Sequence, residues 1–253
     1  ALESQLQYIS HYPDATNDDI LNAIADIYGM NKDQIVVGNG AAELLYAICR
    51  LPGYTGAFVP APGFSEYKAA LEASRIPVRD IYYRPREDEH GKPYFEVPYL
   101  ALETFAAELK GQDGRIIVFL GNPNNPDGTL LDKNHIRTIA SMLKDANSLL
   151  VIDESFIDFV GNDTLQDNEY SMRSLVNEFD NIIVVHSFTK FYAVPGLRIG
   201  AAFSNPLIIE QLNSFIPTWS VNTLAQSYTE AALNDVEYVK RTKQELREEQ
   251  GFM

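Results

Sequence analysis

The chain has 253 residues, and 45% of them are hydrophobic, which is enough for the core of one large domain. Its 35 acidic and 20 basic residues give a net charge of -15, so neither nucleic acid nor an anionic membrane surface is an expected partner, because both attract a basic face. A small molecule is the expected partner. The single cysteine, Cys49, lies among apolar residues, which predicts a buried thiol in a reducing compartment such as the cytoplasm.

Helical and strand patterns alternate along the chain, with glycine and proline turns between them. This order predicts an α/β fold in which a mostly parallel central sheet carries helices on both faces. The predicted helices cover residues 17–28, 41–51, 64–74, 99–110 and 132–145. The predicted strands cover residues 34–37, 56–59, 78–83, 115–120, 148–152, 181–186 and 198–203.

Three further stretches complete the pattern. Residues 84–93 are charged and rich in turn residues, so we expect a surface loop. Residues 222–250 have the pattern of one long helix that leaves this domain. No uncharged apolar run approaches the roughly 18 residues of a membrane span, and the first residues lack the pattern of a signal peptide. The chain begins without methionine and ends directly after a helical stretch, so we interpret it as part of a longer polypeptide.

Two glycine-rich or proline-rich turns follow predicted strands. Residues 38–43, Gly-Asn-Gly-Ala-Ala-Glu, open a helix whose first N–H groups could hold a phosphate, although an ordinary tight turn would have the same sequence. Residues 121–128, Gly-Asn-Pro-Asn-Asn-Pro-Asp-Gly, cannot continue a strand. Their prolines could fix the loop so that Asn125 presents its amide inward, or the loop could be a plain turn.

Two charged side chains also follow predicted strands. Asp153 ends a buried strand, where a carboxylate is costly unless it is paired. A protonated pyridine nitrogen would be a suitable partner, and a magnesium-binding or general-base aspartate would look the same. Lys190 follows the strand at 181–186 and could form a covalent bond with pyridoxal phosphate or be an ordinary solvent-exposed lysine. Arg198 lies eight residues beyond Lys190, and its planar fork suits a phosphate.

Taken together and in this order, the motifs resemble the fold-type-I pyridoxal-phosphate enzymes. The resemblance covers nearly the whole chain and is closest to the histidinol-phosphate aminotransferase branch, which includes L-threonine-O-3-phosphate decarboxylase. Several strings are similar to those of the decarboxylase: His11-Tyr12-Pro13-Asp14, residues 38–46, Phe64-Ser65-Glu66-Tyr67, Thr189-Lys190-Phe191-Tyr192 and Trp219-Ser220-Val221-Asn222.

The resemblance implies pyridoxal 5'-phosphate as cofactor and a role for each matching residue. Lys190 would bind the cofactor covalently and later move protons, and Asp153 would pair with the pyridine nitrogen. Asn125 would hydrogen-bond the phenolic oxygen, and Phe64 would either stack on the ring or only pack in the core. The phosphate would be held by Ser187, Thr189, Arg198, the backbone amides of Ala41 and Ala42, and Tyr12 from a second subunit of a homodimer.

The resemblance also implies a domain organisation. Residues 1–30 would contribute to a small domain and a dimer contact, residues 31–221 would form the large cofactor-binding domain, and residues 222–253 would lead toward a C-terminal small domain. The histidines at 90 and 135 show no metal-ligand spacing, and His186 is expected to be packed at a strand end, so no metal is implied.

One position departs from the aminotransferase pattern. These enzymes usually place a tyrosine three residues after the aspartate, where it donates to the phenolic oxygen, and this chain has Phe156. The resemblance therefore favours decarboxylation of L-threonine O-3-phosphate to (R)-1-amino-2-propanol O-2-phosphate, a step of cobalamin synthesis. Transamination by a histidinol-phosphate aminotransferase or a related enzyme is the alternative, and a non-catalytic cofactor-binding protein is a third. The substrate-gripping arginines of the family lie in a C-terminal region that the chain does not contain.

Overall fold

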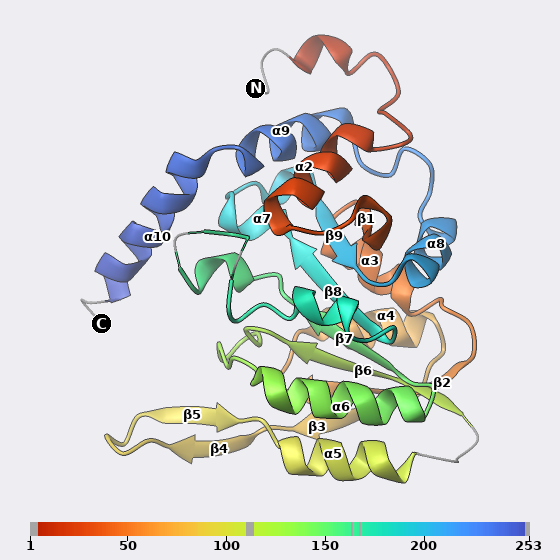
Figure 1. Ribbon diagram of the computed structural model, residues 1–253, viewed down its shortest axis with the longest axis vertical. Coiled ribbons are helices and arrows are strands. Elements are labelled where there is room, and N and C mark those ends of the chain that lie inside the picture. The colour runs from red at the N-terminus through yellow and green to blue at the C-terminus, as the bar shows by residue number, and fades with distance from the viewer. Residues whose placement is uncertain (1–4, 110–113, 163, 167, 251–253) are drawn as a thin grey trace.

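A seven-stranded sheet forms the centre of the protein, in the order β1-β9-β8-β7-β6-β2-β3 (Figure 1). The computed structural model describes residues 5–109, 114–162, 164–166 and 168–250. Strands β2, β3, β6, β7 and β8 pair in parallel, whereas β9 is antiparallel to both β8 and β1. The strands of this sheet are β1 (Ile35–Gly38), β2 (Tyr54–Ala61), β3 (Val78–Tyr82), β6 (Arg115–Gly121), β7 (Leu149–Asp153), β8 (Ile182–Ser187) and β9 (Gly200–Phe203). The predicted fold class, a mostly parallel sheet between helices, is confirmed.

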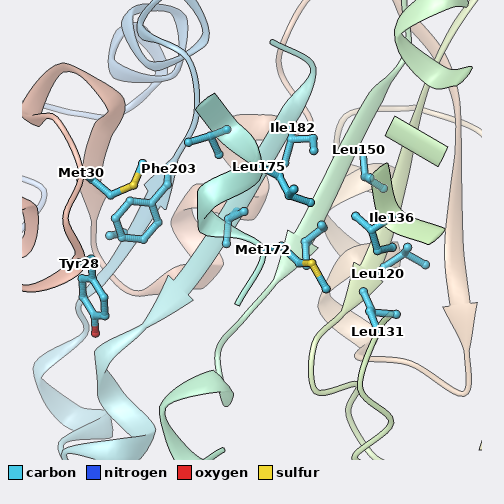
Figure 2. Close-up of a cluster of buried hydrophobic side chains, with 14 of the residues drawn as sticks. Tyr28, Met30, Leu120, Leu131, Ile136, Leu150, Met172, Leu175, Ile182 and Phe203 are labelled. Atoms are coloured by element: carbon cyan, nitrogen blue, oxygen red, sulfur yellow. The ribbon is translucent and has the colours of Figure 1, made fainter. Parts of the chain in front are cut away.

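Side chains that alternate along the central strands pack into two separate cores, one on each face of the sheet. In β7, Leu150 and Ile152 belong to one core, and Leu149 and Val151 belong to the other. Strands buried on both faces must be apolar at every position, which explains the unbroken hydrophobic runs in β6, β7 and β8. Figure 2 shows part of the first core, with Leu150 and Ile182 among its labelled members.

Helices from distant parts of the chain cover the two faces. The first core receives side chains from α2 (Asp18–Tyr28), α5 (Tyr99–Glu108), α6 (Lys133–Asp145), α9 (Thr223–Leu233) and α10 (Val236–Gln250). The second core receives them from α3 (Ala41–Ile48), α4 (Ser65–Ala73) and α8 (Pro206–Phe215). Figure 1 shows α2 beside α9, which are in contact although they lie near opposite ends of the chain. The short helices are η1 (Leu6–Tyr8), η2 (Lys32–Gln34), η3 (Ile157–Phe159), η4 (Arg173–Asn177), α7 (Phe188–Phe191) and η5 (Pro195–Leu197).

The structure corrects two of the expected elements. Residues 84–93 are not a simple loop, because β4 (Arg84–Glu87) pairs with β5 (Pro93–Glu96) in an antiparallel hairpin. All of β4 is exposed, so it lacks the apolar alternation by which a strand is recognised. The predicted helix over 222–250 is two helices, because Asn234 ends α9 and the carboxylate of Asp235 accepts a hydrogen bond from Tyr238 N–H at 2.9 Å.

Other expectations differ only at their boundaries. The helix predicted to reach Lys110 is described as far as Glu108, and Lys110 itself lies outside the described residues. The ends of the predicted outer domains, residues 1–4 and 251–253, also lie outside the described residues.

Helix α8 had no counterpart among the predicted elements. Cys49 is buried, as predicted, and burial raises the pKa of its thiol to about 12. Within the described ranges, every helix is too short or too polar to cross a membrane.

A polar cluster lies inside the first core, next to the end of β8. Asp158 accepts a hydrogen bond from the hydroxyl of Tyr28 at 3.1 Å and lies 3.0 Å from Nε2 of His186. The guanidinium of Arg173 lies 4.1 Å above the Tyr28 ring. Burial alone would raise the pKa of Asp158, but the charge and hydrogen bond of His186, with Arg173 and Tyr28, outweigh it and lower that pKa. The cluster therefore keeps a buried carboxylate ionised.

Asp158→Asn is expected to lower the free energy of unfolding by about 3–5 kcal/mol near neutral pH, because it removes the buried negative charge near Arg173 and His186. The pKa of Asp158 is lower in the folded state than its ordinary value of 3.8. Its stabilisation is therefore complete above that value and is lost as the pH falls through the folded-state pKa. Urea unfolding at pH 7 and below pH 4 should show the difference between wild type and variant shrinking in acid. A difference that stays constant would contradict this, and the exposed Asp26→Asn on α2 is the matched control.

Candidate active site

The carboxyl ends of β6, β7 and β8 meet at one edge of the sheet, and a cavity lies beside them. In parallel strands these ends are adjacent, which is why ligands of α/β proteins gather there. The cavity is lined by Ala41, Ala42, Phe64, Tyr67, Pro123, Asn125, Asp153, Ser155, Phe156, Ser187, Thr189, Lys190 and Arg198. Every residue that the sequence singled out for cofactor binding or catalysis is in this set, except Tyr12.

Asp153 ends β7 and supplies the buried negative charge of the cavity. The residue is only 6% exposed. Its Oδ1 accepts hydrogen bonds from the backbone N–H of Ser155 at 2.9 Å and from the Ser155 hydroxyl at 2.6 Å. Its Oδ2 accepts one from the hydroxyl of Tyr67 at 2.9 Å. Three donors thus hold the carboxylate in one orientation.

The adjoining Glu154 fixes the end of β7 to the neighbouring loops. It is fully buried and accepts hydrogen bonds from Asn122 Nδ2 at 3.1 Å, the Ser171 hydroxyl at 2.7 Å and Met172 N–H at 2.5 Å. Asn122 begins the loop that carries Asn125, and its Oδ1 accepts from Leu131 N–H at 3.0 Å. These contacts set the position of the Asn125 loop relative to Asp153.

Lys190 lies in α7, the short helix that begins immediately after β8. Ser187 is the N-cap of this helix, and its hydroxyl lies 2.8 Å from that of Thr189. The Lys190 Nζ is 3.5 Å from Thr189 Oγ1, so the amine and two hydroxyls share one side of the cavity. Ser187 and Thr189 are buried, whereas the lysine is exposed and so accessible to a ligand.

Arg198 and the first turn of α3 form a third side of the cavity. Arg198 has a left-handed backbone, with φ of 57°, and donates from Nη1 to the carbonyl of Pro195 at 3.2 Å. A Cβ atom on Gly40 would lie 2.4 Å from Arg198 Nη2, and Gly40 itself has φ of 81°. Only glycine therefore lets the guanidinium lie against the start of α3. The N–H groups of Ala41 and Ala42 are in that first turn, where a helix has no acceptors of its own.

The aromatic side of the cavity comes from the start of α4. Phe64 follows β2 as the N-cap of α4, and its ring meets that of Tyr67 edge-on, with centroids 5.7 Å apart. Asn124 Nδ2 donates to the carbonyl of Pro62 at 3.0 Å, which ties the Asn125 loop to the segment before Phe64. Asn125 and Phe64 consequently lie in the same cavity although 61 positions, 125 minus 64, separate them.

Tyr12 lies elsewhere in the described chain. Its side chain is on the surface, where residue 12 is 77% exposed, and its ring stacks on Trp219 with centroids 4.3 Å apart. It does not reach the cavity of its own chain, so its expected role across a subunit boundary stays a prediction. Sequence reasoning gave no role to Tyr67 or Ser155. The spacing Phe64-x-x-Tyr67 was the available signal, because residues three apart share one face of a helix.

The residues around the cavity fit pyridoxal 5'-phosphate. Arg198, the Ser187 and Thr189 hydroxyls and the start of α3 offer donors and positive charge for a phosphate. Asp153 offers a buried carboxylate as acceptor for a protonated ring nitrogen, and Phe64 offers an aromatic face. Lys190 offers a primary amine that could bind the cofactor covalently. Gly40 has a positive φ and no Cβ, which leaves room for the Arg198 guanidinium beside the start of α3. This close approach is the structural observation that supports a phosphate site here.

Comparison with known proteins agrees with this geometry. The chain is 34% identical, over 97% of its length, to the adenosylcobalamin biosynthesis bifunctional protein CobDQ of Leptospira interrogans, of which it covers 26%. It is 32% identical to the threonine-phosphate decarboxylase of Salmonella typhimurium, with 98% of this chain and 64% of that protein covered. It is 30% identical to histidinol-phosphate aminotransferase 1 of Psychrobacter arcticus, with 96% and 59% covered. The chain thus spans less than two thirds of these relatives.

The fold is also that of solved structures. The histidinol-phosphate aminotransferase of Clostridium acetobutylicum superposes with a TM-score of 0.80 at 23% identity, over 95% of this chain and 66% of the other. The profile of the family described as aminotransferase class I and II matches residues 3–253. The chain therefore belongs to the class I and II aminotransferase family, and its cofactor is pyridoxal 5'-phosphate.

Proposed function

We propose that the protein decarboxylates L-threonine O-3-phosphate to (R)-1-amino-2-propanol O-2-phosphate, as a step of cobalamin biosynthesis. The observation that carries the proposal is Phe156, which lines the cavity three residues after Asp153 and has no hydroxyl to donate. Support also comes from the likeness to a threonine-phosphate decarboxylase and to a bifunctional protein of adenosylcobalamin biosynthesis.

In this proposal each side of the cavity has a separate task. When bound, pyridoxal 5'-phosphate supplies an electron sink for the pair left when a bond at the substrate α-carbon breaks. Arg198, Ser187, Thr189 and the start of α3 would bind the phosphate and so fix the position of the ring. Asp153 would keep a positive charge on the ring nitrogen, and Asn125 would donate to the phenolic oxygen.

Lys190 then determines the fate of the proton. Decarboxylation releases carbon dioxide, and the protonated Lys190 side chain would deliver one proton to the α-carbon in its place and become the neutral amine. Thr189 Oγ1, at 3.5 Å, is the neighbour that can hold this amine toward the ring. Transamination uses the same amine in the opposite sense, to remove a proton from the α-carbon. The orientation of the substrate therefore selects the reaction.

Transamination of the histidinol-phosphate type is the second candidate. A 30% identical relative, histidinol-phosphate aminotransferase 1 of Psychrobacter arcticus, favours it. Both candidates require the same cavity residues, so product analysis is the way to separate them.

A shared active site in a homodimer is part of the proposal. Tyr12 stacks on Trp219 at the surface, and Leu6, Tyr8 and Ile9 nearby along the chain are also exposed. An apolar surface of this kind is typical of a protein contact. We propose that Tyr12 reaches the cofactor phosphate of a second subunit and that the protein works in the cytoplasm. In this proposal residues 1–30 form the N-terminal segment, residues 31–221 form the large domain, and residues 222–253 form the connection to a small domain.

Reduction with borohydride in the presence of pyridoxal 5'-phosphate is expected to attach the cofactor irreversibly to Lys190, which peptide mass spectrometry would locate. Lys190→Ala should lose this attachment and reduce turnover at least about 1,000-fold, because the proton-transfer group is removed. Lys68→Ala is the control, since Lys68 pairs with Asp80 outside the cavity. Turnover by Lys190→Ala close to that of wild type would refute the proposed role.

Incubation with L-threonine O-3-phosphate, with 2-oxoglutarate present as an amino-group acceptor, is expected to release carbon dioxide and the amino alcohol phosphate in equal amounts. Incubation with histidinol phosphate and 2-oxoglutarate should give little keto product. Mass spectrometry and carbon dioxide capture measure both reactions. Keto product from either amino compound without carbon dioxide would eliminate the decarboxylase proposal and favour the aminotransferase.

Phe156→Tyr is expected to raise the ratio of transamination to decarboxylation by up to about tenfold, since one added hydrogen bond is worth about 0.5–1.5 kcal/mol. The ratio is obtained from the two products in the same reaction. Phe159→Tyr, which adds the same hydroxyl at a residue that does not line the cavity, is the control. An unchanged ratio in Phe156→Tyr would remove this residue from the explanation of reaction choice.

A further inference from the structure

Tyr67 is the buried cavity residue to which the sequence assigned no role. It lies in α4, three residues after Phe64, and is only 2% exposed. Its ring stacks on Phe119 with centroids 5.3 Å apart and meets the Phe64 ring edge-on. Its hydroxyl donates a hydrogen bond to Asp153 Oδ2 at 2.9 Å. The ring is therefore fixed by packing, and the hydroxyl is aimed at one carboxylate oxygen.

The direction of this hydrogen bond is determined by charge. Burial, and then the charge of Asp153, raise the pKa of Tyr67 well above its ordinary value, so the hydroxyl keeps its proton and donates. The other oxygen, Oδ1, is already held by the N–H and hydroxyl of Ser155. Without Tyr67, Oδ2 would lose the side-chain donor that the structure gives it.

We infer that Tyr67 is a positioning residue that acts through Asp153, by holding its carboxylate in the orientation that meets the ring nitrogen of the cofactor. This inference rests on the proposed role of Asp153 and is independent of which reaction the protein catalyses. In this inference Phe64, the N-cap of α4, stacks on the cofactor ring, and Tyr67, one helical turn later, holds Asp153 at the edge of that ring. The side-chain rings of Phe64 and Tyr67 pack edge-on, so a change in one residue is expected to affect the position of the other.

A comparison of two cofactors separates this role from simple packing. The probes are pyridoxal 5'-phosphate and its analogue in which a C–H group replaces the ring nitrogen. Tyr67→Phe keeps the ring and its contacts with Phe64 and Phe119 but removes the hydroxyl. The variant should bind pyridoxal 5'-phosphate about tenfold more weakly, since a hydrogen bond to a charged group is lost. It should bind the analogue within about twofold of wild type, because the analogue has no nitrogen for Asp153 to meet.

Equilibrium dialysis or fluorescence titration gives both dissociation constants. Tyr83→Phe is the control, because Tyr83 is also buried and its hydroxyl has no hydrogen-bond partner among the described residues. This control should leave the affinity for each cofactor unchanged, and urea unfolding should show that both variants are folded.

Three outcomes would overturn the inference. Equal losses for both cofactors in Tyr67→Phe would mean that the residue acts on the shape of the cavity or directly on the ring. No loss for either cofactor would mean that its hydrogen bond has no role in binding. If wild-type protein bound both cofactors equally well and Asp153→Asn changed neither affinity, the proposed role of Asp153 would fail first, whatever Tyr67→Phe did.

Discussion

The central constraint on this structure is the carboxylate of Asp153, which is buried at the end of a strand. A charge that is 6% exposed is stable only if its surroundings replace the lost water. Ser155 and Tyr67 replace that water with three hydrogen bonds to the carboxylate. In the proposed function, a protonated cofactor ring adds a positive charge beside it. In the proposed function the position of Asp153 thereby determines where the cofactor ring lies, and Lys190, Arg198 and Asn125 line the same cavity.

The sheet makes this arrangement rigid. Residues before Asp153 alternate between the two cores, so β7 cannot slip by one position without placing the acid in an apolar core. Glu154 adds a second restraint through its hydrogen bonds to the loops that follow β6 and precede η4. On the next strand, β8, His186 directly precedes Ser187 and is held by Asp158, which lies 3.0 Å from its Nε2. Two buried acids therefore position the strand ends without lining the cavity.

Much of the fold and site could be predicted because it depends on local sequence. The hydrophobic runs in β6, β7 and β8 predict buried parallel strands. The polar residues directly after these strands are then expected to meet at one edge of the sheet. The exposed hairpin of β4 and β5 was missed because none of its residues in β4 is buried, and hydrophobic alternation then carries no signal. The break at Asn234 was missed because capping by Asp235 depends on a single side chain. Tyr67 was missed because its partner is 86 positions away, and only the folded chain brings them together. The stacking of Tyr12 on Trp219 is a long-range contact of the same kind.

The central claim is that Asp153 holds a positive charge on the cofactor ring. The nitrogen-15 chemical shift of pyridoxal 5'-phosphate labelled at the ring nitrogen measures this directly in the bound state. The account predicts a protonated nitrogen in the wild-type protein across neutral pH and a neutral nitrogen in Asp153→Asn. The same shift in both proteins, or a neutral nitrogen in the wild type, would contradict it.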